Sequence, residues 1–319
     1  MTLRSVVRGV GAHLPDRVVE NAWFAGFLDT SDAWIRSRTG IERRRFAAEG
    51  ELTSDLAAAA GRAALANAGM EAGAVDAVIV ATTTPDATFP STAVKVQAAL
   101  GCGGFAYDVM AACAGFVFAM ANADAMIRAG LARRVLVIGA ETYSRILDWE
   151  DRGTCVLFGD GAGAVLLEGA DEDGRGILSA DLHSDGAQAG ILYVDGGVSS
   201  TGTAGKLRMH GREVFRHAVE KLAATATAAL ERAGLDHSDV DWVVPHQANV
   251  RIIEGTARRL GVPMEKVVVT VADHGNTSAA SIPLALSVAA ADGRLRPGQV
   301  VVTEAIGGGL AWGSVVLRW

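Results

Sequence analysis

The chain is poor in cysteine, with only Cys102, Cys113 and Cys155 among its 319 residues, and it contains no Cys-x-x-Cys pair. Three thiols at unrelated spacings exclude a disulfide framework, and the missing pair argues against a zinc site. The seven histidines also fall outside metal-ligand spacings, so neither a metal nor another cofactor is expected. Free thiols of this kind are typical of the reducing cytoplasm.

Positive charge is also scarce, because 29 lysines and arginines stand against 36 aspartates and glutamates, a formal net charge of −7. A general nucleic-acid-binding protein has a basic surface, so that class is disfavoured. No apolar stretch reaches membrane-spanning length before Gly, Asp or Arg interrupts it. The start, MTLRSVVRGVGAHLP, lacks the apolar core of a signal peptide. We therefore expect a cytoplasmic protein that binds neither nucleic acid nor membrane.

Apolar and small residues are abundant: 50% of the chain is hydrophobic and 38 residues are glycine. Such a composition buries a large core and excludes intrinsic disorder. Apolar runs alternate with alanine-rich segments of helical period, which is typical of an α/β sheet covered on both faces. The expected strands are the N-terminal segment, 75–83, 105–109, 134–140, 163–168, 240–245, 266–271 and 299–305, and the expected helices are 53–68, 114–129, 212–233 and 279–291.

Three segments of the first half recur 165 residues later. The pairs are AALANAG (63–69) with AALERAG (228–234), VDAVIV (75–80) with VDWVVP (240–245), and RVLVIGAE (134–141) with QVVVTEAI (299–306). Agreement at one offset indicates two similar α/β halves, 1–170 and 171–319, the second with an insertion at 184–206. Because ligands in open α/β sheets bind beyond the carboxyl ends of strands, we expect the site where the strand-to-helix loops of both halves meet.

Cys113 lies at such a junction, between the strand-like run FAYDV (105–109) and the helix that follows AACAGF (111–116). Backbone amides and the dipole at a helix N-terminus lower the pKa of a thiol and favour a nucleophilic thiolate. From position alone, a buried structural cysteine is an equally good interpretation. For Cys102 and Cys155, which lack such a junction, packing in the core or a loop is the better interpretation.

The second half supplies polar residues at matching places. His246 follows the strand VDWVVP, and Asn276 lies in DHGNTSAAS (273–281), where Ser278 corresponds to Cys113 at the 165-residue offset. An imidazole and an amide there are suitable donors to a developing enolate or oxyanion. Taken singly, each is more often a loop cap or a satisfied polar residue.

Two glycine-rich segments have different interpretations. The triple glycine of EAIGGGLAWGS (304–314) leaves backbone amides open to a ligand, although a tight turn explains it equally well. GDGAGA (159–164) has the spacing of a dinucleotide-binding loop, but it leads into the strand-like AVLLEG instead of a helix. That context disfavours nucleotide binding at GDGAGA.

Together these segments resemble the β-ketoacyl-acyl-carrier-protein synthase III enzymes of the thiolase superfamily. The resemblance covers nearly the whole chain and is carried, in order, by SDAWIRSRTGIERR (31–44), AACAGF (111–116), DRGT (151–154), FGDGAGA (158–164), GREVF (211–215), PHQANVRII (245–253), HGNTSAAS (274–281) and GGGLAWGS (307–314). It implies a homodimer with a thiolase-like fold, a duplicated five-layered αβαβα arrangement, which agrees with the internal repeat.

The resemblance also implies a reaction: decarboxylative Claisen condensation of acetyl-CoA, or another short acyl-CoA, with malonyl-acyl carrier protein, initiating fatty acid synthesis. Cys113 would carry the acyl group as a thioester. His246 and Asn276 would bind the malonyl thioester carbonyl and stabilise the enolate left by loss of carbon dioxide. The amides of Cys113 and Gly308 would form the oxyanion hole. Covalent catalysis divides the condensation into two easier steps.

Three sets of binding residues are implied as well. Coenzyme A would contact Thr30, Trp34, Arg38, Arg152, Gly211, Phe215, Ala248 and Asn249, with the adenine between Trp34 and Arg152, whose flat side chains suit stacking. The acyl pocket would be lined by Phe89, reaching across the dimer interface, Leu157 and Ile306. The acidic carrier protein would be steered to a surface made of Gln247, Ala248, Asn249, Val250, Arg251, Arg212 and Arg216, with Arg258 and Arg259 nearby. Without the resemblance, Trp34 and Arg38 fit a surface helix end, and the arginines fit a solvated helix face.

Other functions predict different residues or products. A related starter or secondary-metabolite condensing enzyme would share Cys113, His246 and Asn276 and differ in its acyl-CoA or acceptor. A degradative thiolase would have a second cysteine in the loop that here holds Asn276 and Ser278. A non-catalytic carrier-binding protein would lack the nucleophile or a donor, and a cysteine hydrolase would release free acid.

Overall fold

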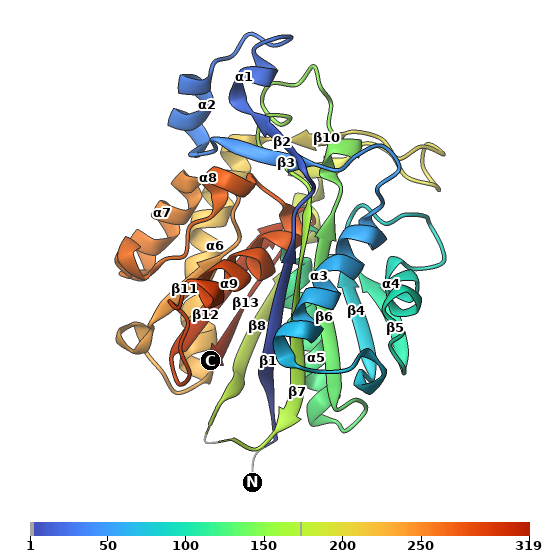
Figure 1. Ribbon diagram of the computed structural model, residues 1–319. Helices are drawn as coiled ribbons and strands as arrows, with labels where there is room; N and C mark the ends of the chain where they lie inside the picture. Colours follow the sequence, from blue (N-terminus) through green and yellow to red (C-terminus); the bar gives the residue numbers. More distant parts are fainter. Residues whose placement is uncertain (1–2, 173) are drawn as a thin grey trace.

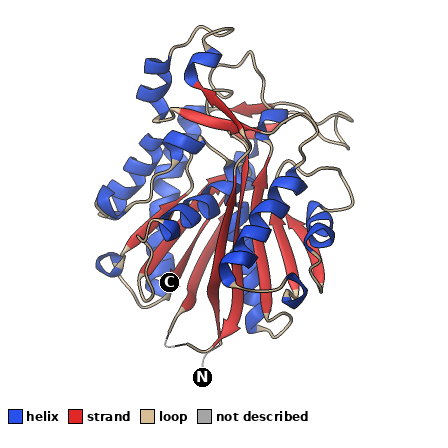
Figure 2. Ribbon diagram, in the orientation of Figure 1, coloured by secondary structure: helices blue, strands red, loops and turns tan. Residues whose placement is uncertain are grey.

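The computed structural model describes residues 3–172 and 174–319. Within these residues two main sheets lie close together, as Figures 1 and 2 show, with strand orders β1-β7-β6-β4-β5 and β11-β12-β13-β8. Two small antiparallel pairs, β2-β3 and β9-β10, lie beside them. The strands are β1 (Arg4–His13), β2 (Arg17–Glu20), β3 (Arg43–Phe46), β4 (Ala77–Ala81), β5 (Phe105–Val109), β6 (Arg134–Glu141), β7 (Gly161–Ala170), β8 (Gly176–Ser184), β9 (Leu192–Val194), β10 (Leu207–Met209), β11 (Trp242–Pro245), β12 (Val300–Gly307) and β13 (Ala311–Arg318).

Helices cover both faces of each main sheet. The helices are α1 (Asn21–Phe24), α2 (Asp32–Thr39), α3 (Thr53–Ala68), α4 (Thr92–Leu100), α5 (Gly115–Arg128), α6 (Gly211–Arg232), α7 (Val250–Leu260), α8 (Val271–His274) and α9 (Ser281–Ala291). α3 and α4 pack on the N-terminal sheet, α5 and α9 lie between the sheets, and α6, with α7 beside it, packs on the C-terminal sheet (Figure 1). Helix and sheet layers therefore alternate as the expected αβαβα arrangement.

Small residues allow these layers to approach closely. α9 (SIPLALSVAAA) is apolar all round and mostly buried, as a helix between two sheets must be. A Cβ on Gly9 or Gly11 of β1 would stand 2.4 or 2.2 Å from a backbone oxygen of α3, so only glycine permits this contact. Among the described residues, none of the helices combines the length and apolar character that crossing a bilayer requires.

Most of the expected elements are present, including the N-terminal strand, and GDGAGA leads into β7 as its context predicted. The expected strand at 266–271 is wrong. Val267 forms a single bridge to Val243, and α8 begins at Val271. The reason is a side chain: Gln247 Oε1 accepts the N–H groups of Thr270 and Val271 at 2.8 and 3.1 Å, so these groups are satisfied without a neighbouring strand.

The internal repeat corresponds to matching elements around the two middle helices. A short 3-10 turn, η2 (Ala112–Ala114), opens α5, and another, η7 (Ser278–Ala280), opens α9. The structure therefore aligns Cys113 with Ala279, and the equivalence with Ser278 expected from the 165-residue offset is wrong by one residue. β7 ends at Ala170 in the five-stranded sheet, and β8 begins at Gly176 in the four-stranded sheet. We propose that the chain divides into its two halves after residue 170.

Candidate active site

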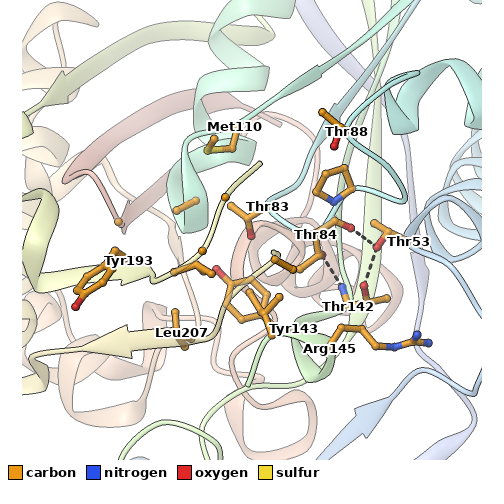
Figure 3. A pocket seen from close by; sticks show the side chains of 18 of the residues that line it. Thr53, Thr83, Thr84, Thr88, Met110, Thr142, Tyr143, Arg145, Tyr193 and Leu207 are labelled. Atoms are coloured by element: carbon orange, nitrogen blue, oxygen red, sulfur yellow. Dashed lines mark hydrogen bonds between the residues drawn. The ribbon is translucent and has the colours of Figure 1, made fainter. Parts of the chain in front are cut away.

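Cys113 lies in η2, between β5 and α5, and is 5% exposed. It lines a cavity of about 840 Å³, a size that accommodates a small-molecule ligand. Figure 3 shows other side chains of the cavity wall: threonines crowd one side and apolar or aromatic groups the rest. These residues include Thr53, Thr83, Thr84, Thr88, Thr142, Arg145, Met110, Tyr143, Tyr193 and Leu207.

The wall of threonines is held rigid by its own hydrogen bonds. Thr53 Oγ1 donates to the carbonyl oxygen of Thr84 at 2.6 Å and lies 2.9 Å from Thr142 Oγ1. The backbone N–H of Thr142 in turn donates to Thr84 Oγ1 at 2.8 Å. These bonds join α3, the loop after β4 and the end of β6 (Figure 3). The cavity therefore has a preformed polar side.

The thiol of Cys113 is in its neutral form at pH 7. Burial raises its pKa to about 12, the Ser278 and Tyr143 hydroxyls oppose the rise, and the Glu141 carboxylate adds to it. Burial therefore opposes the pKa depression expected from the helix N-terminus, because removal from water disfavours the thiolate.

Sequence reasoning missed Glu141, at the end of β6. Its fully buried carboxylate accepts hydrogen bonds from the hydroxyls of Thr82–Thr84, at 2.7 to 3.3 Å, and from Ser278 Oγ at 3.0 Å. Burial raises the pKa of Glu141 to about 7 in spite of these donors. The available signal was a charged residue that ends the apolar run VLVIGAE.

Asn276 is fixed by its backbone and by its amide oxygen. Its N–H donates to Leu157 O and its carbonyl accepts from Gly159 N–H, both at 2.9 Å. Asn276 Oδ1 accepts the N–H of Ser278 at 2.9 Å. The oxygen of the side chain is thereby engaged, so its NH2 group is the part that can meet a ligand.

His246 follows β11 and is 4% exposed. Its backbone N–H donates to Glu304 O at 2.8 Å, and its Nδ1 lies 2.6 Å from Ser281 Oγ. Burial lowers the pKa of His246 to about 3, so the ring is neutral at pH 7. The ring nitrogen left to meet a ligand is Nε2.

Adjoining turns bring these three residues to one end of the sheets. η2, which holds Cys113, packs against η7, which directly follows Asn276 and Thr277. Ser281, the partner of His246, is the first residue after η7. The structure thus packs the turn that holds Cys113 against the segment that holds Asn276 and the partner of His246. Among the described residues that line the cavity of Cys113, neither His246 nor Asn276 is included.

The triple glycine completes this end of the cavity. A Cβ on Gly307 would stand 2.5 Å from Cys113 N, so a larger residue there would displace the nucleophile. Gly308 lines the same cavity as Cys113. Gly308 therefore lies on the same wall as Cys113.

The residues expected to hold adenine and phosphate cluster on α2 and the loop 151–154. The guanidinium carbon of Arg152 lies 4.9 Å from the Trp34 ring centroid, and that of Arg38 lies 5.5 Å from it. Arg152 also donates to Asp29 O, next to Thr30. Among the described residues, Thr30 Oγ1 is buried without a hydrogen-bond partner.

The expected tunnel residues lie where α6 and α7 begin, and these two helices pack together. Gly211 and Phe215 are in the first turns of α6 and are exposed. Ala248 and Asn249 directly precede α7, and Asn249 Oδ1 accepts the N–H of Ile252 at 3.0 Å as a helix cap.

None of the three expected acyl-pocket residues is among the described residues that line the cavity of Cys113. Leu157 belongs to the segment that pairs with Asn276, and it packs against an apolar cluster that shares Tyr143 and Phe158 with the cavity wall. Ile306 packs with Ala218 and Leu222 of α6, because its side chain leaves β12 on the α6 face. Phe89 is 83% exposed and adjoins Thr88, which does line the cavity.

The expected carrier surface is exposed at its arginines, half-buried at Ala248–Val250 and buried at Gln247. Arg212, Arg216, Arg251, Arg258 and Arg259 are exposed on α6 and α7. Gln247 has no exposed surface, and its amide bonds Pro245, Val268, Thr270 and Val271. The predicted contact of Gln247 with a docked carrier protein is therefore wrong, because its side chain is buried and hydrogen-bonded to the backbone of Val268, Thr270 and Val271.

Among the described residues, no group of three or more His, Cys, Asp or Glu side chains is arranged to hold a metal ion.

Comparison with known proteins gives a consistent set of relatives. Residues 107–186 match the family described as 3-oxoacyl-[acyl-carrier-protein] synthase III, and residues 230–319 match its C-terminal part. A β-ketoacyl-[acyl-carrier-protein] synthase III of Paracoccus denitrificans is 71% identical over 321 residues, covering 99% of each chain. The crystal structure of 3-oxoacyl-[acyl-carrier-protein] synthase III from Aquifex aeolicus has a TM-score of 0.94 at 45% identity, covering 99% of this chain and 100% of that chain. The priming β-ketosynthase of the R1128 polyketide pathway has a TM-score of 0.93 at 37% identity, covering 100% of this chain and 97% of that chain.

Proposed function

The chain belongs to the 3-oxoacyl-[acyl-carrier-protein] synthase III family, and on that premise we propose that it condenses acetyl-CoA, or another short acyl-CoA, with malonyl-acyl carrier protein through a thioester on Cys113. As a member of this family it is an acyltransferase with the thiolase fold that initiates fatty acid synthesis. The observation that carries the proposed mechanism is that the turn holding Cys113 packs against the turn that follows Asn276, while His246 and Asn276 each have a partner on the side-chain atom that the mechanism does not use.

In the first step, the sulfur of Cys113 attacks the thioester carbonyl of acyl-CoA. The carbon–sulfur bond to coenzyme A breaks, and the proton that leaves the Cys113 thiol ends on the coenzyme A thiol. The oxyanion of the tetrahedral intermediate accepts the N–H groups of Cys113 and Gly308, beside the cavity. Preorganised amide donors of this kind stabilise charge that develops in the transition state.

In the second step, His246 Nε2–H and the Asn276 NH2 donate to the thioester carbonyl of the malonyl group. Loss of carbon dioxide leaves an enolate on that oxygen, and its carbon attacks the acyl carbonyl on Cys113. The carbon–sulfur bond to Cys113 then breaks, 3-ketoacyl carrier protein leaves, and the Cys113 thiolate takes a proton from water. A neutral imidazole suits this role, since burial lowers the pKa of His246 to about 3. Decarboxylation supplies the carbanion, so the step needs no strong base.

Coenzyme A is proposed to enter along the starts of α6 and α7, with its adenine at Trp34 and Arg152. The Arg152 guanidinium carbon lies 4.9 Å from the Trp34 ring centroid, so the two flat groups are neighbours, and they would have to separate for adenine to stack between them. The carrier protein is proposed to dock over Arg212, Arg216 and Arg251, beside Ala248–Val250. Exposed arginines attract an acidic partner although the whole chain is negative.

We also propose a homodimer, on two features of the N-terminal sheet. β5 is an edge strand that pairs with β4 on one side. Met110, which directly follows β5, is 78% exposed, and Phe89, in the loop between β4 and α4, is 83% exposed. An open edge with exposed apolar side chains is a self-association surface. Phe89 of one chain would then close the acyl cavity of its partner and limit acyl length.

A cytoplasmic location is proposed as well, because the three free thiols fit a reducing compartment.

The second candidate is a condensing enzyme that takes a longer or different starter, as the structural similarity to a priming β-ketosynthase suggests. The cavity of about 840 Å³ favours it, because an acetyl group fills a small part of that volume. The proposals differ only in the acyl-CoA used.

The test is a product assay with malonyl-acyl carrier protein and a panel of acyl-CoAs. We expect 3-ketoacyl carrier protein and carbon dioxide in equal amounts, dependent on both substrates, with acetyl-CoA the best starter. Preference for a longer acyl-CoA would select the second candidate. Free acid from acyl-CoA without condensed product would refute both and indicate a hydrolase.

A further inference from the structure

Ser281 is a buried hydroxyl that the mechanism above does not use. It is the first residue of α9 and is 2% exposed. Its Oγ lies 2.6 Å from His246 Nδ1 and accepts the N–H of Gln247 at 3.3 Å. His246 is held at the same time through its own backbone N–H, which donates to Glu304 O. His246 is therefore held to β12 through its backbone and to the start of α9 through its ring.

These two contacts determine where the hydroxyl proton of Ser281 points. The N–H of Gln247 is a donor, so it occupies a lone pair of Oγ and cannot receive a proton. Among the described residues, His246 Nδ1 is the other polar atom within hydrogen-bond distance of Oγ. A buried hydroxyl that donates to nothing is an unsatisfied group, which costs free energy. A Ser281 proton that points to Nδ1 avoids this cost, and Nδ1 then carries no proton of its own.

We propose that Ser281 is a positioning residue that holds His246 in the tautomer protonated on Nε2, aimed at the malonyl thioester carbonyl. This inference rests on the proposed function, in which His246 is a donor to that carbonyl. In a neutral imidazole one nitrogen donates and the other accepts, so an accepting Nδ1 makes Nε2–H the donor. A donor fixed in tautomer and direction before the substrate arrives costs no reorganisation during the reaction.

The same device orients the second donor. The N–H of Ser278 donates to Asn276 Oδ1 at 2.9 Å, which turns the NH2 group away from that contact. Ser278 and Ser281 both belong to HGNTSAAS, so one segment of the second half supplies Asn276 and also sets the direction of both donors. These contacts give the two serines of the motif a role beside that of Asn276.

Three variants separate positioning from folding. Ser281→Ala removes the hydroxyl, and Ser281→Thr keeps one. Ser5→Ala is the matched control, because Ser5 is also a buried serine whose Oγ donates to a side chain, Asp124 Oδ1 at 2.7 Å, but it lies in β1. Acylation of Cys113 by acetyl-CoA alone and condensation of the acyl-enzyme with malonyl-acyl carrier protein are timed separately.

We expect Ser281→Ala to lower the condensation rate about 10- to 100-fold, less than loss of a whole oxyanion donor, with acylation changed by no more than about twofold. Ser281→Thr should recover most of the rate, and Ser5→Ala should leave both steps unchanged. Condensation by Ser281→Ala at the parental rate would overturn the proposal.

The tautomer is read directly from the parental enzyme by 15N NMR of labelled histidine, with the His246 signal assigned by its loss in His246→Gln. The proton should be on Nε2, and a proton on Nδ1 would overturn the proposal even if Ser281→Ala does not fold. An enzyme that acetyl-CoA fails to acylate would refute the proposed function instead, and the spectrum would still decide the role of Ser281.

Discussion

Ala112 and Ser278 adopt the same left-handed backbone conformation, with φ angles of 47° and 50°, at the first position of equivalent turns in the two halves. Such angles are unfavourable for residues with a Cβ, and they are retained where function needs the geometry. In the first half the turn places Cys113 on the cavity wall. In the second half it places Ser278 Oγ against Glu141 and near the same thiol.

His246→Ala and Asn276→Ala should each lower the condensation rate by about 100-fold or more, since each removes a donor to the enolate, and should leave acylation of Cys113 nearly intact. Stopped acylation and condensation assays measure the two steps. Asn67→Ala is the control for loss of a structural amide, because Asn67 Oδ1 accepts the N–H of Val10 away from the site. Equal loss of both steps would refute the division of roles.

Trp34→Ala and Arg152→Ala should raise the KM for acyl-CoA by about 5- to 100-fold with little change in kcat, because stacking of a base on a flat side chain contributes about 1–3 kcal/mol. Arg294→Ala is the matched control, since Arg294 lies over Trp242 at 5.9 Å in another part of the molecule. Initial rates against acyl-CoA concentration give both constants. An unchanged KM in both site variants would show that the adenine does not bind at Trp34 and Arg152.

Much of the fold and part of the site follow from sequence pattern. The runs AVIV (77–80) and VLVIGA (135–140) form buried strands because every residue is apolar or small, and the two halves are visible because their strands repeat at one offset. Cys113, His246 and Asn276 could be found since each sits in a distinctive segment at a strand end. The packing of the turn of Cys113 against the turn after Asn276 follows from the duplicated topology.

The remainder depends on contacts that pattern does not encode. The predicted strand at 266–271 does not form because the side chain of Gln247 accepts the N–H groups of Thr270 and Val271. The same hydrogen bonds bury Gln247, so it is not part of the carrier surface. The pKa of Cys113 rises chiefly because of burial, which no local motif reports. Ile306 misses the cavity because strand alternation turns it toward α6, a direction that the family resemblance alone did not supply.

Glu304→Gln should increase stability at alkaline pH. Burial raises the pKa of Glu304 from 4.5 to about 8, and its Oε2 has no partner among the described residues. The folded state then binds one proton more than the unfolded state between these values, so stability falls with rising pH by about 1.4 kcal/mol per unit from this group.

Denaturant unfolding between pH 7 and 8 isolates this contribution, because the raised pKa of Glu141, about 7, affects lower pH values more. Glu304→Gln should flatten the decline in this interval, whereas Glu71→Gln, on the exposed surface, should keep it. A parental stability curve that rises from pH 7 to 8, unchanged in Glu304→Gln, would refute the raised pKa.

Light scattering should give the parental protein twice the mass of one chain. Phe89→Asp should shift the equilibrium toward the single chain, because burying a carboxylate at the partner's cavity is unfavourable. Leu131→Asp, at another exposed apolar position, after α5 and away from the cavity, is the control and should remain a dimer. A monomeric parent at assay concentration would reject the dimer and, with it, the closing role of Phe89.

Intact mass spectrometry tests the central claim most directly. The protein is incubated with acetyl-CoA, its adduct is mapped by peptide, and malonyl-acyl carrier protein is then added. The account predicts one acetyl group on Cys113, present in Cys155→Ala, absent in Cys113→Ala, and lost as 3-ketoacyl carrier protein forms. No adduct from any short acyl-CoA, or an adduct on Cys102 or Cys155 that malonyl-acyl carrier protein leaves in place, would contradict it.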